Sequence, residues 1–198
     1  MIVDSRGILF AVACLLSIAL ACGGRTQARA SEPGSAAPVS APAQPQQPAS
    51  PRSPGWLAVD SAARTVTLTL ATTSRPGASS ALINEYRNGE ARVVVPVGWT
   101  VKWDWRNSDT ASSHSLVVMV QREKIPAEGG RPSLTNAMSR MVTEGLAPGQ
   151  TDQTTFLAEE AGWYWLLCGV PGHALAGEWL ELRVDPAATT ASVQIKKA

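Results

Sequence analysis

The sequence has few of the residues that build most metal sites and active sites. Its 198 residues include only two histidines and three cysteines. It contains no Cys-x-x-Cys pair and no glycine-rich phosphate loop, so a closed structural zinc site and a phosphate-loop nucleotide site are not expected. One long apolar run is present, at the N-terminus, which excludes a polytopic membrane protein.

An excess of charge of either sign is also lacking. Charged residues make up 17% of the chain, and the formal net charge is +1. This balance argues against a basic nucleic-acid binder and against an acidic disordered chain. The length allows one domain or two small ones.

Residues 1–21 have the pattern of a signal peptide of lipoprotein type. Arg6 supplies a positive charge, and an apolar stretch of 15 residues follows, which is short for a membrane-spanning helix. Small residues directly before Cys22 are typical of a processing site at which this cysteine becomes the lipidated first residue. The alternative is ordinary cleavage after Ala21, which leaves Cys22 as an N-terminal thiol.

Residues 22–55 are expected to form a tether. Seven of the chain's 14 prolines lie between Pro33 and Pro54, mixed with alanine, serine and glutamine, and the stretch has no aromatic residue. It cannot bury enough apolar surface to offset the entropy of ordering, and its proline density keeps it extended. A lipid at Cys22 would therefore hold the next domain at a distance from a membrane.

Residues 56–185 carry all seven tryptophans and read as one all-β domain, followed by a C-terminal tail at 186–198. Apolar residues alternate with polar ones over 65–70 and 101–105, and short β-branched or aromatic runs occupy 92–95, 115–120, 163–167 and 179–184. Many short strands separated by turns indicate an antiparallel sandwich or barrel. A short helical insertion is expected over 133–144, with Met138 and Met141 on its buried face.

The chemistry-bearing residues converge on one short run. Cys168 is followed five residues later by His173, across a Gly-Val-Pro-Gly turn. The other histidine, His114, ends a turn and opens an expected strand. A thiolate with two imidazoles is the trigonal set of a blue-copper centre, which also takes a weaker axial ligand. The alternative for Cys168 is a buried, inert thiol that behaves as a small hydrophobe.

The sequence around these residues resembles the cupredoxins, and within them the sulfocyanins. The likeness covers residues 65–184. It is strongest in Gly-Trp-Tyr-Trp-Leu-Leu-Cys-Gly-Val-Pro-Gly-His-Ala at 162–174, which is followed by Gly-Glu-Trp at 177–179. The resemblance implies a Greek-key β-sandwich, one copper ion, and one-electron transfer in a respiratory chain outside the cytoplasmic membrane. Carried over residue by residue, it assigns His114, Cys168 and His173 to copper.

Glu178 departs from the family pattern, because it stands where sulfocyanins have the axial methionine. A carboxylate is hard and anionic, so a coordinating Glu178 predicts a lower reduction potential than that of a methionine-ligated relative. The alternative is that Glu178 turns to solvent or pairs with an arginine. Ser115 replaces the asparagine that often follows the first copper histidine, and it can still form hydrogen bonds across the loops. Met119, Met138 and Met141 are interpreted as core residues.

These observations predict an exported electron carrier that is anchored to a membrane by its N-terminal lipid, and not an enzyme. Its partner would be a redox protein such as a cytochrome or a terminal oxidase. Electrons would leave through His173, whose loop is apolar. We expect a monomer that does not bind nucleic acid. The alternatives are a periplasmic copper-binding or trafficking protein, an accessory copper subunit of an oxidase, a metal-free sandwich, and small-molecule redox chemistry at an open copper position.

Overall fold

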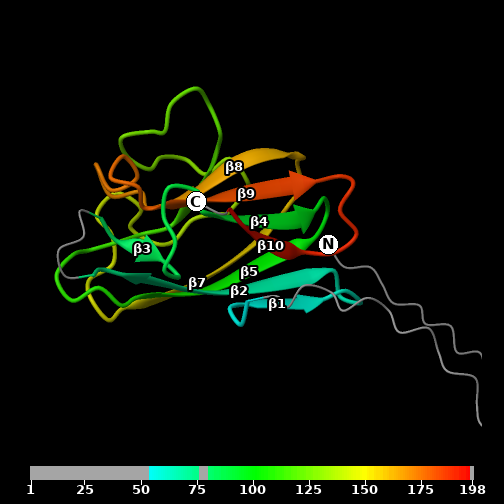
Figure 1. The fold of residues 1–198 in the computed structure, drawn as a ribbon, viewed down its shortest axis with the longest axis horizontal. Helices are drawn as coiled ribbons and strands as arrows, with labels where there is room; N and C mark the ends of the chain where they lie inside the picture. The colour runs from blue at the N-terminus through cyan, green and yellow to red at the C-terminus, as the bar shows by residue number, and fades with distance from the viewer. Residues whose placement is uncertain (1–53, 76–79, 197–198) are drawn as a thin grey trace, which may run out of the picture. The chain divides into compact units, whose positions relative to one another are not determined.

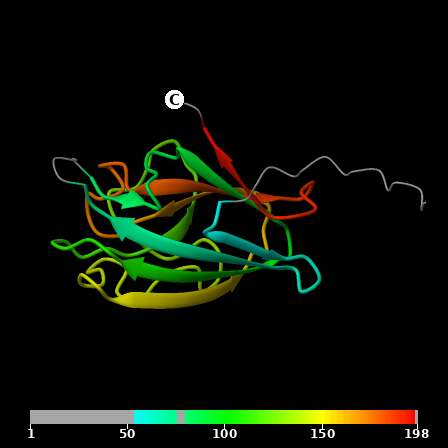
Figure 2. The same cartoon turned by 60° about the horizontal axis from the view of Figure 1, so that its bottom comes forward.

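A computed structural model describes residues 54–75 and 80–196 of the chain. The expected signal peptide, the lipidation residue Cys22 and nearly all of the expected tether lie outside these residues. The described part forms ten strands and no helix, and therefore no helix that could cross a bilayer. The strands lie in two layers, which Figures 1 and 2 show from two directions.

Each layer is a five-stranded sheet. The first sheet has the order β1 (Leu57–Asp60), β2 (Thr65–Thr73), β5 (Thr100–Asn107), β7 (Thr151–Leu157), and β3 (Leu82–Ile83) also pairs with β2. The second sheet has the order β10 (Ser192–Ile195), β4 (Ala91–Pro96), β9 (Trp179–Asp185), β8 (Gly162–Leu167), β6 (Val117–Val120). The all-β sandwich expected from the sequence is thus confirmed. The expectation of a purely antiparallel arrangement was wrong: the sheets are mixed, because β2 pairs with β5, and β4 with β9, in parallel.

The alternating sequence pattern explains how the two sheets pack. In β5, Val101, Trp103 and Trp105 are buried, whereas the residues between them face solvent. Trp103 meets Phe156 of β7 edge to face, with ring centroids 5.5 Å apart. Inward residues of both sheets form one continuous core. At about 25 cal/mol per Å² of buried apolar surface, large side chains such as these tryptophans contribute much of the folding energy.

Strand order brings two distant loops to one end of the sandwich. β6 runs antiparallel to β8, and Val117 at the start of β6 is paired with Leu167 at the end of β8. The segment before β6 and the segment after β8 therefore meet. The first contains His114 and the second begins with Cys168, so the topology alone places these two residues close together.

The helix expected over residues 133–144 is wrong. The segment forms turns, and Asn136 and Met141 have φ values of 64° and 51°, which a right-handed helix does not allow. Its backbone groups bond to the chain leading into β6: Ser139 N donates to Leu116 O at 2.7 Å. Tertiary pairing has overridden the local helical pattern. Met138 and Met141 are 42% and 56% exposed, so the interpretation of these two as core residues is also wrong.

Four of the ten described strands, β1, β3, β7 and β10, were not expected from the sequence. β7 has the sequence Thr-Asp-Gln-Thr-Thr-Phe-Leu, which offers little apolar alternation. β10 lies beyond the boundary at residue 185 and pairs with β4 along residues 192–195. The domain thus extends past Asp185, and β10 forms one edge strand of the second sheet.

Ion pairs connect three strands across the outer face of the second sheet. Arg92 of β4 donates through Nε to Oε2 of Glu181 on β9 at 2.7 Å, and Lys196, just after β10, pairs with the other oxygen. Burial would raise the pKa of Glu181, but hydrogen bonds from Lys196 and Arg92 lower it below its ordinary value. Arg92 and Arg183 also lie over the ring of Trp163, at 4.5 and 4.7 Å from its centroid.

Candidate metal centre

Four potential metal ligands meet where the loops of one end converge. Cys168 directly follows β8, and Glu178 directly precedes β9. Because β8 and β9 are paired, the positions of both residues are fixed by the adjoining strand ends. The Cys168 N–H donates to Glu178 O at 3.0 Å, and the Glu178 N–H donates to His173 O at 3.1 Å. These bonds fold residues 168–178 into a compact loop. His114 reaches the same place from the segment before β6.

The ligand atoms point toward one another. The Nδ1 atoms of His114 and His173 are 3.2 Å apart, and Cys168 Sγ lies 3.8 Å from the first and 3.5 Å from the second. Glu178 Oε2 is 2.9 Å from His114 Nδ1 and 3.3 Å from His173 Nδ1. One ligand atom from each of the four residues lies within 4.8 Å of the others. The structure thus brings together every metal ligand expected from the sequence.

Glu178 is buried in this cluster and does not face solvent. Its side chain is 1% exposed, and its nearest partners are the two histidines rather than an arginine. The alternative of a solvated or arginine-paired Glu178 is therefore wrong. Oε1 of the same carboxylate has no hydrogen-bond partner among the described residues. A buried carboxylate oxygen left without a partner is costly, and a cation held by the carboxylate would offset that cost.

The two histidines of the cluster have raised pKa values, so they hold protons at the place where a metal ion would bind. Burial lowers the pKa of His114, but hydrogen bonds to Cys168 and Glu178 outweigh it and raise the pKa to about 10. Hydrogen bonds to Cys168 and Glu178 raise the pKa of His173 to about 9. Burial would raise the pKa of the Cys168 thiol, yet its two histidine neighbours lower it. The sulfur and the carboxylate thus meet two imidazole rings that hold protons, and a metal ion bound there would displace those protons.

Ser115 fastens the thiol to the neighbouring loop, as expected from the sequence. Its backbone N–H donates to Cys168 Sγ at 3.4 Å. Its hydroxyl accepts the Gly169 N–H at 2.9 Å and donates to Val142 O at 2.6 Å. An N–H that donates to sulfur stabilises the thiolate form, and the hydroxyl bonds hold the sulfur in place.

Asp109 is a site residue that the sequence analysis missed. Its Oδ2 lies 3.0 Å from Nε2 of His114, and the residue is 5% exposed. Burial would raise the pKa of Asp109, but bonds from the Ala111 N–H, His114 and Ser74 lower it to about 2. The only signal in the sequence was an aspartate five residues before a histidine, and such residues are common in turns.

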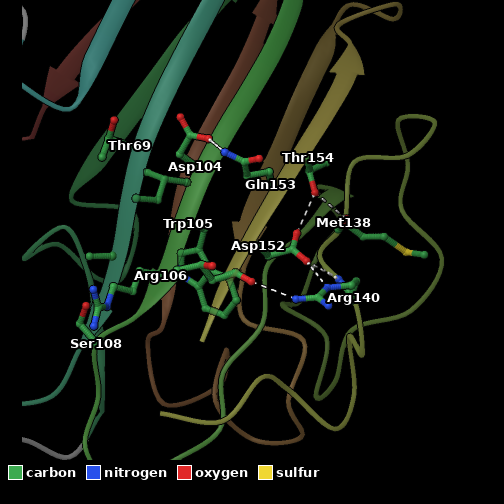
Figure 3. Close-up of a pocket in the computed structure, with 13 residues that line it drawn as sticks. Thr69, Asp104, Trp105, Arg106, Ser108, Met138, Arg140, Asp152, Gln153 and Thr154 are labelled. Carbon is green, nitrogen blue, oxygen red and sulfur yellow. Dashed lines mark hydrogen bonds and ion pairs between the residues drawn. The ribbon is translucent and has the colours of Figure 1, made fainter. Parts of the chain in front are cut away.

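A small cavity of about 200 Å³ adjoins the cluster, and Asp109, His114, His173 and Glu178 line part of it. A larger hollow of about 760 Å³ lies over β2, β5 and β7, and Figure 3 shows it. There Arg140 donates to the buried Asp152, and Gln153 donates to Asp104. No histidine or cysteine lines the larger hollow.

The donor set fits copper. A thiolate and two imidazoles suit copper or zinc, and the fourth donor is a single carboxylate oxygen rather than a second thiolate. Both histidines present Nδ1 to the cluster, and the ring of His114 is held through Nε2 by Asp109. The orphaned oxygen of Glu178 further indicates that a cation belongs here.

No curated protein matches this chain. Among solved structures it is similar to reduced rusticyanin, with 20% identity and a TM-score of 0.44 over 62% of this chain and 85% of that one. It is also similar to dithionite-reduced auracyanin from the photosynthetic bacterium Roseiflexus castenholzii, with 24% identity and a TM-score of 0.42 over 60% of this chain and 97% of that one.

A family comparison is more decisive. The model of the sulfocyanin (SoxE) domain matches residues 53–195, which include all ten strands and all four residues of the cluster. This confirms the resemblance on which the sequence analysis relied, together with its implication of a cupredoxin that uses copper. The chain belongs to the sulfocyanin family, whose members are copper proteins that transfer electrons rather than enzymes.

Proposed function

We propose that His114, Cys168, His173 and Glu178 bind one copper ion and that the protein carries single electrons with it. The observation that carries this proposal is the convergence of their four ligand atoms within 4.8 Å at one end of the sandwich. When bound, copper supplies the one-electron Cu(II)/Cu(I) couple. The chain would supply the soft thiolate, the two imidazoles, and the buried carboxylate of Glu178, which stands where the family has a methionine.

Rigid placement of the ligands makes them suitable for repeated electron transfer. Cys168 is anchored by strand β8 and by Ser115, and Glu178 is anchored by strand β9. Ligands held in this way move little when the charge of a bound ion changes, so the energy needed for reorganisation stays small. The carboxylate of Glu178 favours Cu(II), which lowers the reduction potential relative to a methionine ligand.

His173 is the route by which electrons would enter and leave. Its side chain is 29% exposed, whereas those of His114 and Glu178 are 2% and 1% exposed. Leu175, which is 59% exposed, and the exposed Pro171 flank it. A small apolar surface around a partly exposed ligand suits brief docking with a redox partner. We propose a cytochrome or a terminal oxidase as that partner.

The location of the protein is proposed from the N-terminal sequence. Residues 1–21 have the pattern of a lipoprotein signal peptide, and 22–55 have the composition of an extended tether. A lipid on Cys22 would anchor residues 56–185, as a monomer, at the outer face of a membrane, where a respiratory chain operates. The tether would let the copper domain reach more than one partner.

The test is the visible spectrum of the copper-loaded protein and of Cys168→Ser. The wild-type protein is expected to show an intense thiolate-to-copper band, and the variant is expected to lose it, because serine provides no thiolate. Cys22→Ser is the matched control and should retain the band. A Cys168→Ser protein that keeps the wild-type spectrum would disprove the ligand assignment.

A further inference from the structure

We propose that Asp109 is a positioning residue of the metal centre. Its carboxylate fixes which ring nitrogen His114 presents to the cluster, and its charge favours the more positive oxidation state of the bound metal. This inference rests on the proposed function, because it concerns the same copper site. It assigns a role to a residue that lies outside the four ligands.

Asp109 is itself held firmly in place. Its backbone N–H donates to Oδ1 of Asn107 at 3.0 Å, and its own Oδ1 accepts the Ala111 N–H at 2.8 Å. Asn107 is fully buried at the end of β5, and its amide donates to Leu146 O at 2.8 Å. Since Oδ1 is used within the turn, Oδ2 is left for His114. The chain of bonds thus connects a strand end to the histidine ring.

The bond to Asp109 determines the orientation of the His114 ring. Imidazole has two nitrogens, and the one that donates a hydrogen bond cannot bind a metal at the same time. Nε2 lies 3.0 Å from a carboxylate oxygen that can only accept, so Nε2 carries the proton. Nδ1, which lies 3.8 Å from Cys168 Sγ, then presents its lone pair once its own proton is displaced by a metal.

Asp109 also adds a buried negative charge. It is 5% exposed and Glu178 is 1% exposed, so water screens neither charge well. Together with the Cys168 thiolate they place three negative charges around the cluster. A doubly positive ion gains more from each of these charges than a singly positive ion does. Removing the charge of Asp109 should therefore weaken the binding of Cu(II) more than the binding of Cu(I).

The experiment compares Asp109→Asn with Asp152→Asn in the full-length protein. Asparagine removes the charge and leaves one acceptor oxygen, so either Nε2 of His114 or the Ala111 N–H loses its acceptor. Asp152 is a matched control, because it is also a buried aspartate but pairs with Arg140 away from the cluster. The Cu(II) dissociation constant of Asp109→Asn should rise about 10- to 100-fold, and its reduction potential should rise, with the thiolate band retained. Asp152→Asn should match the wild type in both.

Equal Cu(II) affinity and equal potential in wild type and Asp109→Asn would overturn the inference and leave Asp109 a turn-forming residue only. A colourless wild-type protein would instead overturn the proposed function, so the two failures are distinct. Should Asp109→Asn not fold, the ¹⁵N nuclear magnetic resonance spectrum of the Cu(I) wild-type protein decides. A proton on Nε2 of His114 supports the role of Asp109, and a proton on Nδ1 contradicts it.

Discussion

Replacing Glu178 by glutamine removes one buried charge while keeping the shape of the side chain. Glu178 Oε2 lies 2.9 and 3.3 Å from the two Nδ1 atoms of the cluster. At about 4 Å, two unit charges interact by about 4 kcal/mol at the effective dielectric constant of about 20 that describes proteins. Cu(II) carries one more positive charge than Cu(I), so the variant should lose about that much of its preference for Cu(II).

This loss corresponds to a large change in reduction potential. Each 1.4 kcal/mol is a factor of ten, so about 4 kcal/mol is about three powers of ten in the ratio of Cu(II) to Cu(I) affinity. At about 59 mV per power of ten for one electron, the potential of Glu178→Gln should rise by about 170 mV. Glu178→Met should move it in the same direction, because a thioether is neutral and also favours Cu(I).

Voltammetry of the copper-loaded proteins measures the shift directly. Glu181→Gln is the control, because Glu181 is three residues away but pairs with Arg92 and Lys196 on the outer face of the sheet. Its potential should stay close to that of the wild type. A Glu178→Gln protein with an unchanged potential and an unchanged electron paramagnetic resonance spectrum would refute the assignment of Glu178 as a copper ligand.

Three further predictions concern stability and docking. Glu181→Gln removes the ion pairs with Arg92 and Lys196, so it should lower the free energy of unfolding at pH 7 by about 1–3 kcal/mol. Urea titrations measure this difference from the wild type. The difference should vanish as the pH falls through the lowered pKa of Glu181, because the wild-type carboxylate is then protonated. In the protein without copper the pKa of His114 is raised from 6.5 to about 10. The contribution of the protonated ring to stability should therefore be complete below pH 6.5 and be lost as the pH rises toward 10. Copper affinity, measured by competition with a chelator, should rise over the same range, because copper must displace the proton from the ring. Leu175→Asp should slow electron self-exchange about tenfold without changing the reduction potential, because like charges on two copies would meet at the docking surface. Nuclear magnetic resonance line widths measure the self-exchange rate. An unchanged rate would mean that the docking surface lies elsewhere.

The sequence revealed the fold where burial alternates regularly. The pattern of Val101, Trp103 and Trp105 predicted a half-buried strand, and β5 has that form. It did not reveal β7, whose residues are mostly polar, or β10, which is held by pairing with β4. The helix expected over residues 133–144 failed for the same physical reason, because hydrogen bonds to distant residues, and not local spacing, decide the conformation of that segment.

The ligand cluster was more accessible to sequence reasoning than its surroundings. Cys168 and His173 are five residues apart, and His114 is the only other histidine, so the sequence itself offered these three ligands. The resemblance supplied the position of Glu178. Whether Glu178 faces the cluster could not be settled from the sequence, because a loop glutamate is usually solvated. The turn around Asp109 is a local pattern, because Asn107 and Asp109 each accept the N–H of the residue two positions later. Asp109 was missed because the turn pattern does not show that its other oxygen meets the ring of His114.

The most direct test of the central claim is the absorption and electron paramagnetic resonance spectrum of the full chain loaded with Cu(II). We predict an intense visible band from the thiolate of Cys168 and a copper signal that disappears on one-electron reduction and returns on reoxidation. A colourless protein, or one whose copper signal does not respond to reduction, would contradict the account of His114, Cys168, His173 and Glu178 as an electron-transfer centre.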